Sequence, residues 1–182
     1  MTQHKVLLVP GSLRSGSHTT RLLRATGQLV PSPYVSEFSD QVRALPHYDA
    51  DYDGEGALPI VVSTRTVLDA ADAVIISTPE YNGTIPGGLK NWVDWVTRPA
   101  RAHVLIGKPI AIVGAAPGSK GAIGAVTWLR NTMGYLGAVV VGDAVAIPDI
   151  VNKVNEDGSY VDEVAEQLRA LVSALVATLT EV

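Results

Sequence analysis

The chain has 182 residues, of which 47% are hydrophobic, and its 18 acidic and 14 basic residues give a formal net charge of -4. This length and apolar content predict a single globular domain over residues 1–182. The mild negative charge and the lack of any Lys or Arg run argue against a nucleic-acid partner. Because the chain has no cysteine, disulfides and thiol redox chemistry are excluded, and any redox activity requires a bound cofactor.

The first apolar run, residues 6–9, ends at Pro10 and Gly11. It is too short for the core of a signal peptide, and no stretch reaches the roughly 18 apolar residues of a membrane span. We therefore expect a cytoplasmic protein that does not associate with a membrane.

Five short runs that contain β-branched residues predict β-strands at residues 6–9, 35–38, 73–77, 110–113 and 138–141. Most of these runs are continuously apolar rather than alternating, which is typical of parallel strands covered by helices on both faces. Segments of helical length separate them. The pattern predicts a doubly wound α/β fold with a five-stranded parallel sheet.

Helices are predicted at residues 19–29, 60–71, 127–136 and 161–179, and around an apolar stripe that comprises Leu89, Trp92, Val93 and Val96. Thr84 and Pro86 fit the start of the striped helix. Ser159 with Asp162 resembles a capping box for the last helix. Residues 44–59 show neither period and predict a long loop.

Residues 11–20 follow the first strand and form a loop rich in glycine and hydroxyl groups. Such a loop exposes the amides at the start of a helix to an anion, while Ser12, Arg14, Ser17 and Thr19 add side-chain donors. The lysine of a Walker loop and the glycine spacing of a dinucleotide fingerprint are both missing. A terminal monophosphate such as that of FMN is the favoured ligand, and an ordinary serine-rich turn is the alternative.

Two further loops follow the third and fourth strands. In the first, Tyr81 offers a flat face and Asn82 offers hydrogen-bonding groups for the edge of a ring, although a rigid turn with an incidental aromatic residue is also possible. The second, residues 114–121, is made of small residues that admit a planar ring, and its Lys120 either attracts an anionic ligand or is solvated. In a sheet of order 2-1-3-4-5 these loops lie beside the phosphate loop.

Three motifs together resemble the NADPH-dependent FMN reductase family: Gly-Ser-Leu-Arg-x-Gly-Ser at 11–17, Pro-Glu-Tyr-Asn at 79–82 and Pro-Gly-Gly-Leu-Lys-Asn at 86–91. The resemblance covers about residues 5–150. It implies a flavodoxin-like fold, bound FMN, NADPH or NADH as co-substrate, and a homodimer or homotetramer. Trp95 does not fit the apolar stripe, so it lies either in the core or at a subunit interface.

The same resemblance implies two groups of FMN-binding residues. The phosphate group would lie against Ser12, Arg14, Ser17 and Thr19. The isoalloxazine ring would lie along Pro79, Glu80, Tyr81, Asn82 and Gly83, with Ala116 and Gly118 completing the pocket.

The implied activity is that of an oxidoreductase which moves hydride from NAD(P)H to FMN and then electrons to a quinone, free flavin, azo compound or similar acceptor. We predict no catalytic acid or base and no metal, because the four histidines are scattered and the flavin carries the chemistry. Arg98 either meets the extra phosphate of NADPH or caps a helix end. The alternatives are an FMN electron carrier without NAD(P)H turnover, and a flavin-free interaction domain.

Overall fold

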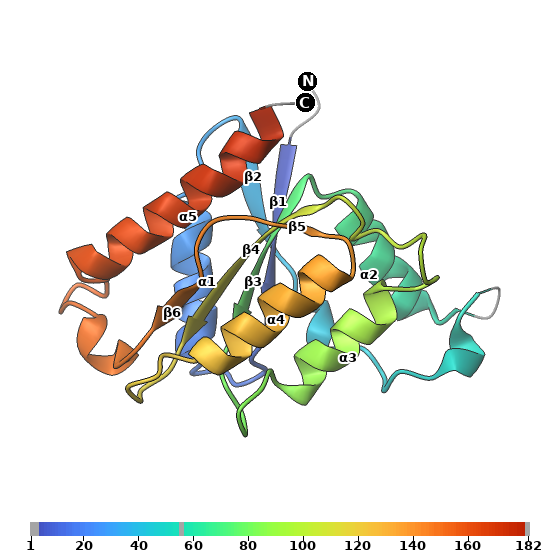
Figure 1. The fold of residues 1–182 in the computed structure, drawn as a ribbon, viewed down its shortest axis with the longest axis horizontal. Coiled ribbons are helices and arrows are strands. Elements are labelled where there is room, and N and C mark those ends of the chain that lie inside the picture. Colours follow the sequence, from blue (N-terminus) through green and yellow to red (C-terminus); the bar gives the residue numbers. More distant parts are fainter. Residues whose placement is uncertain (1–3, 55–56, 181–182) are drawn as a thin grey trace.

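The structure is a computed structural model that describes residues 4–54 and 57–180. Its strands form one parallel sheet in the order β2-β1-β3-β4-β5, with β6 also paired to β4 (Figure 1). The predicted doubly wound class and strand order are confirmed. The strands are β1 (His4–Pro10), β2 (Tyr34–Phe38), β3 (Ala73–Thr78), β4 (Pro109–Ala115), β5 (Val139–Val140) and β6 (Val145–Ile147).

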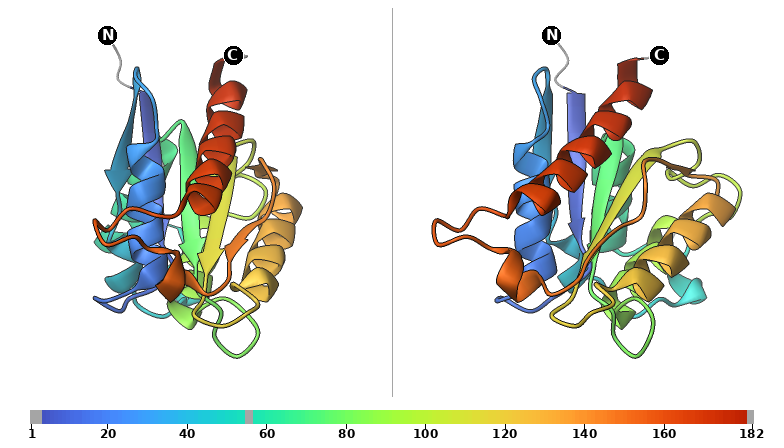
Figure 2. Two further views of the ribbon diagram at one scale, coloured as in Figure 1. Left: turned by 90° about the vertical axis from the view of Figure 1, so that its left-hand side faces the viewer. Right: turned by 60° about the vertical axis from the view of Figure 1, so that its left-hand side comes forward.

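Helices cover both faces of the sheet (Figures 1 and 2). The α-helices are α1 (His18–Gln28), α2 (Pro59–Asp69), α3 (Gly87–Val96), α4 (Ile123–Tyr135) and α5 (Asp162–Thr180). Three short 3-10 helices are η1 (Gln41–Arg43), η2 (Ala50–Tyr52) and η3 (Ile150–Lys153). Of the helices within the described ranges, none is long and apolar enough to cross a bilayer.

The core lies in two layers, one on each side of the sheet. Along β1, Val6 and Leu8 pack with α1 and α5, whereas Leu7 and Val9 pack with α2, α3 and α4. All four side chains are at least 96% buried, since their exposed fractions are 4% or less. This two-sided burial is the physical reason for the continuous apolar runs in the sequence.

Two helix starts differ from the prediction. Helix α4 begins at Ile123, four residues before the predicted residue 127, because Ala122 takes up a left-handed conformation with φ of 69° and turns the chain into the helix. The capping box predicted for α5 does not form. The Ser159 hydroxyl instead donates to Asp157, and the helix begins only at Asp162.

Of the predicted fifth strand, residues 138–141, only Val139 and Val140 form a strand, and a separate strand follows it. Strand β5 pairs with the first residues of β4, and β6, which the sequence analysis missed, pairs with its last residues. Between them Gly142 has a φ of 65°, outside the extended range of a strand. The Arg130 guanidinium of α4 donates to the Gly142 carbonyl at 2.7 Å and so satisfies backbone at the interruption.

The long loop at 44–59, of which residues 55–56 lie outside the described residues, is fastened to α2 and α3. The Trp95 indole donates to the Pro46 carbonyl at 2.9 Å, and the Tyr48 hydroxyl donates to Asp53 at 2.7 Å. Arg65 forms an ion pair with the same carboxylate at 3.0 Å. Trp95 is fully buried, so of the two locations predicted for it the core is the one observed.

Lys108 caps the end of α2 from the start of β4. Its ammonium donates to the carbonyls of Leu68 at 2.9 Å and Asp69 at 3.1 Å, and burial lowers the pKa of Lys108. We expect Lys108→Met to lower the free energy of unfolding by about 2 kcal/mol, because it leaves these carbonyls without a donor. Urea unfolding measures the change, and Lys120→Met, at an exposed lysine, is the control. Equal stability of both variants would contradict this role.

Candidate active site

The loops that follow β1, β3 and β4 meet at the carboxyl edge of the sheet, where they enclose a cavity of about 310 Å³. This convergence of three predicted loops is confirmed. Eight of the eleven predicted site residues line the cavity: Ser12, Arg14, Ser17, Thr19, Pro79, Glu80, Tyr81 and Ala116. Asn82, Gly83 and Gly118 are not among the lining residues.

The loop after β1 is held close to β3. The Gly11 amide donates to the Ser77 carbonyl at 2.7 Å, and a Cβ at position 11 would lie 2.4 Å from that oxygen. The loop then turns, with the Ser17 amide donating to the Arg14 carbonyl at 3.2 Å. Ser17 directly precedes α1 and caps it by accepting from the Thr20 amide at 3.2 Å.

This loop carries several donors that no protein group uses. In residues 12–20, all of which the structure describes, the backbone amides without a hydrogen-bond acceptor are those of Ser12, Leu13, Ser15, Gly16, His18 and Thr19. The Arg14 guanidinium is exposed and forms no hydrogen bond or ion pair with the described residues. Helix α1 has no acidic residue in its first turn. The arrangement favours a bound anion.

The loop after β3 contains a tight turn. Tyr81 and Thr84 exchange backbone hydrogen bonds of 2.9 and 3.2 Å, and the two residues between them, Asn82 and Gly83, have φ values of 52° and 79°. Positive φ at both central positions explains an Asn-Gly pair here. Asn82 and Gly83 therefore form the turn, whereas Pro79, Glu80 and Tyr81 line the cavity. That all five residues lie along the flavin ring stays a prediction.

The loop after β4 is tied to the segment that follows β6. The Ala116 amide donates to the Ile147 carbonyl at 3.1 Å, and its carbonyl accepts from the Ile150 amide at 3.2 Å. Gly118 lies further along the same loop, where its carbonyl accepts from the Asp149 amide at 3.2 Å. Ala116 therefore lines the cavity, whereas Gly118 connects the loop to the segment after β6 through its carbonyl.

A model of the NADPH-dependent FMN reductase family matches residues 4–152. The chain belongs to this family. An NAD(P)H-dependent FMN reductase of Pseudomonas aeruginosa is 37% identical over 165 residues, which cover 90% of this chain and 88% of that protein. The solved structure of FerB, an NAD(P)H:acceptor flavoenzyme of Paracoccus denitrificans, is 31% identical, covers 98% of both chains and has a TM-score of 0.85.

Membership in the FMN reductase family makes this chain an NAD(P)H-dependent flavin oxidoreductase with FMN as its cofactor. The residues present fit FMN, since a phosphate group accepts from donors such as the free amides of the first loop and the hydroxyls that line the cavity there. The sequence analysis missed three lining residues, His18, Ala115 and Pro117. Burial lowers the pKa of His18, and Arg21 and Arg14 lower it further. The position of His18, at the first residue of the helix that follows the loop, was the signal in the sequence that could have placed it at the cavity.

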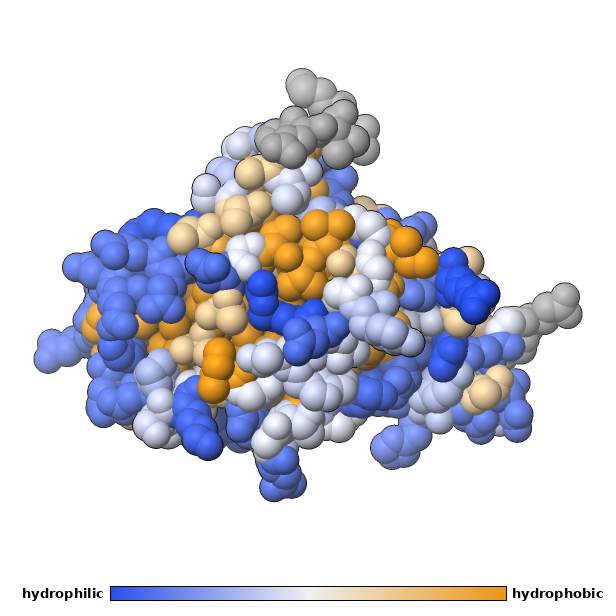
Figure 3. Space-filling view, in the orientation of Figure 1, coloured by the Kyte–Doolittle hydropathy of each residue, from blue (hydrophilic) through white to orange (hydrophobic). Residues whose placement is uncertain are grey.

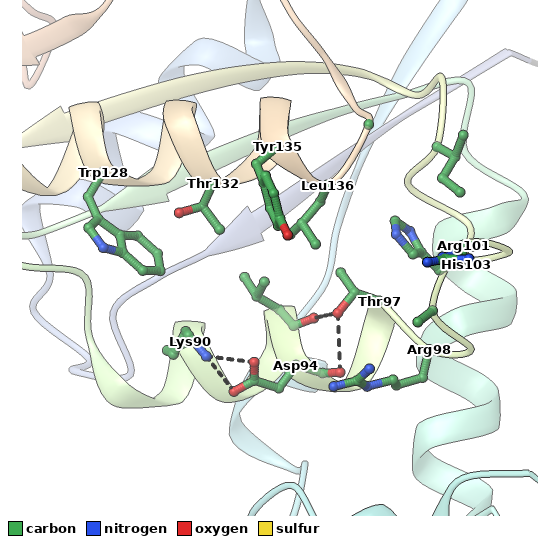
Figure 4. A pocket seen from close by; sticks show the side chains of 14 residues that line it. Lys90, Asp94, Thr97, Arg98, Arg101, His103, Trp128, Thr132, Tyr135 and Leu136 are labelled. Atoms are coloured by element: carbon green, nitrogen blue, oxygen red, sulfur yellow. Dashed lines mark hydrogen bonds and ion pairs between the residues drawn. The ribbon is translucent and has the colours of Figure 1, made fainter.

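A second cavity of this FMN reductase, of about 690 Å³, lies between α3 and α4, and we call it the α3–α4 groove (Figure 4). Lys90 and Asp94 line it from α3, Trp128 and Tyr135 line it from α4, and Arg98 lies in the loop after α3. Arg98 lies 3.8 Å from Asp53 and forms no hydrogen bond with a helix carbonyl in the described residues. The suggestion that it caps a helix end is therefore wrong.

His103 also lines the α3–α4 groove and is 8% exposed, and its buried Nδ1 has no partner among the described residues. Burial, and then Arg98, lower its pKa below the ordinary 6.5. Because the unfolded chain binds a proton more readily, we expect the free energy of unfolding to fall as the pH drops below 6.5. His103→Gln is expected to flatten this dependence in urea unfolding at a series of pH values. An unchanged pH profile would contradict the prediction.

Proposed function

We propose that the cavity at the carboxyl edge of the sheet holds FMN with its phosphate group in the loop after β1. Ser12, Arg14, Ser17 and Thr19 bind the phosphate, together with the free amides of that loop. The isoalloxazine ring lies along Pro79, Glu80 and Tyr81, with Ala116 on the opposite wall. The observation that carries this assignment is the set of unused amide donors in the loop before α1. That loop lines the same cavity as the loops after β3 and β4.

When bound, FMN supplies the ring that accepts hydride from NAD(P)H and passes electrons to the second substrate. The chain itself binds and orients. Tyr81 lines the cavity and is still 48% exposed, so that side of the site stays open to NAD(P)H and then to the acceptor. Backbone amides of the enclosing loops favour negative charge on the reduced ring without a protein acid or base.

The proposed acceptor is a quinone or a free flavin. A relative from Burkholderia named 2-hydroxy-1,4-benzoquinone reductase is 36% identical over 160 residues, which cover 87% of this chain and 86% of that protein. The residues proposed to lie along the ring, Pro79, Glu80, Tyr81 and Ala116, include no cation, which fits a flat and uncharged acceptor. Azo compounds belong to the same proposal.

The proposal includes a homodimer or homotetramer in the cytoplasm, where reduced nicotinamide coenzymes are supplied. The α3–α4 groove is the proposed contact surface. Exposed apolar side chains accompany it: Ile106 is 50% exposed, Val139 46%, and Tyr135 90%. Figure 3 shows apolar atoms gathered on this side of the molecule. Sedimentation equilibrium tests the assembly, and a monomer at micromolar concentration would refute it.

The function is tested with the purified protein under anaerobic conditions. We expect the protein to bind FMN, seen as flavin absorbance retained after gel filtration, and to oxidise NADPH or NADH when a quinone or free FMN is added. A panel with benzoquinone, free FMN and an azo dye, run with both coenzymes, identifies the acceptor class. A protein that retains no flavin after incubation with FMN would overturn the proposal.

A further inference from the structure

Helix α4 does not cap its own N-terminus. The residue before it, Ala122, offers no side-chain acceptor, and its first turn contains no acidic residue. The acceptor comes from another loop, because the Glu80 carboxylate accepts from the Ala125 amide at 3.2 Å. Glu80 lies 45 residues earlier in the chain and belongs to the loop after β3.

Gly124 provides the space for this contact. A Cβ at position 124 would lie 2.9 Å from one carboxylate oxygen of Glu80 and 3.3 Å from the other. Any larger residue therefore displaces the carboxylate from the start of α4. By contrast, Gly134 in the same helix has open space around the corresponding position. The Glu80 carboxylate therefore occupies space that is available only because residue 124 has no side chain.

We propose that Glu80 is a positioning residue of the FMN site. Glu80 lines one wall of the cavity, and its carboxylate accepts from an amide at the start of α4, which continues from the loop that forms the opposite wall. The contact therefore fixes the distance between the two walls. The role in FMN binding rests on the site proposed above, whereas the contact between Glu80 and α4 does not.

The contact with α4 also offsets the negative charge that Glu80 brings to the FMN cavity. A free carboxylate in a cavity for a phosphorylated, electron-rich cofactor would repel that cofactor. At the start of α4 the Glu80 charge is balanced by the helix dipole and by the Ala125 hydrogen bond. The contact thus orients the carboxylate toward the helix and leaves the loop backbone for the ring.

The first test compares Glu80→Ala with Glu80→Gln, in which an amide oxygen remains to accept from Ala125. In the FMN-free protein, we expect Glu80→Ala to speed hydrogen exchange at the first-turn amides of α4 and Glu80→Gln to change it little. In titrations of Tyr and Trp fluorescence, we expect the Kd for FMN to rise about fivefold for Glu80→Ala and less than twofold for Glu80→Gln. Glu166→Ala, at an exposed glutamate of α5, is the control.

The second test is a double-mutant cycle with Gly124→Ala, measured by urea unfolding of the FMN-free protein. Alone, Gly124→Ala is expected to displace Glu80 and speed the same α4 amides. In the Glu80→Ala background the clash is gone, so Gly124→Ala should no longer speed hydrogen exchange at the α4 amides. It should then raise the urea midpoint of unfolding, because alanine favours a helix more than glycine does. The control Gly134→Ala should raise that midpoint in either background.

Three outcomes overturn the inference. Additive effects of the two substitutions would show that Glu80 and Gly124 do not interact. An unchanged Kd for FMN in Glu80→Ala, despite faster exchange in α4, would refute the positioning role and leave a cap alone. Equal losses in Glu80→Ala and Glu80→Gln would assign the effect to charge. A wild-type protein that binds no FMN would instead refute the proposed function, while the cycle would still report on the contact.

Discussion

Replacing Arg14 with alanine is expected to raise the Kd for FMN by about tenfold or more, because a charged donor to a phosphate contributes roughly 1.5–3 kcal/mol. The Arg14 guanidinium lines the cavity and uses none of its donors on the protein, so its removal should not disturb the fold. Fluorescence titration measures the Kd. Adding Ser12→Ala should raise the Kd for FMN further, since Ser12 lines the same cavity.

Riboflavin makes this test specific to the phosphate group. It carries the same ring and lacks the phosphate, so its Kd should change little in Arg14→Ala, and the preference for FMN over riboflavin should collapse. Arg169→Ala, which removes an exposed arginine of α5, should preserve that preference. If Arg14→Ala and wild type discriminate equally between the two flavins, the phosphate group does not lie in the loop after β1.

The second large effect is expected from Gly11→Ala. A Cβ there would lie 2.4 Å from the Ser77 carbonyl oxygen and 2.9 Å from a Leu89 methyl, and the strand that carries Ser77, β3, is paired with β1 on one side and β4 on the other. Such overpacking is expected to lower the free energy of unfolding by about 3 kcal/mol and to displace the loop that carries the phosphate donors. Urea unfolding of the FMN-free protein gives the change in stability.

The control for this substitution is Gly87→Ala, because a Cβ at position 87 meets nothing within 4 Å. We expect the control to unfold at the wild-type urea concentration or slightly above it. Gly11→Ala should in addition bind FMN weakly even at low temperature, where the variant remains folded. A stability equal to that of Gly87→Ala would mean that the loop can separate from β3 without cost.

The fold was predictable because the strands are buried on both faces. Residues 73–76, for example, form an unbroken apolar run of the kind that a central parallel strand requires, and the loops at its carboxyl end then follow from the topology. The capping role of Ser17 was not predicted, although its signal is local, since a serine directly before a helix satisfies one of its first amides. That residues 1–182 form one domain stays a prediction.

What the sequence did not predict depends on contacts between distant residues. Nothing in the residues around Gly124 indicates that a carboxylate 44 positions earlier occupies the space beside it, because that contact arises from the packing of two loops. Asn82 was assigned to the ring edge because an amide can bond a flavin. Its positive φ shows that the residue also meets a backbone requirement of the turn, and its place at the ring edge stays a prediction.

The division of the outer strand beside β4 has a consequence for the behaviour of the protein in concentrated solution. Strand β5 has two residues and β6 has three, and the guanidinium of Arg130 lies where the two are separated. A neighbouring molecule that approaches this border of the sheet therefore finds no continuous row of free amides and carbonyls to extend. The interruption should protect the protein against β-mediated aggregation.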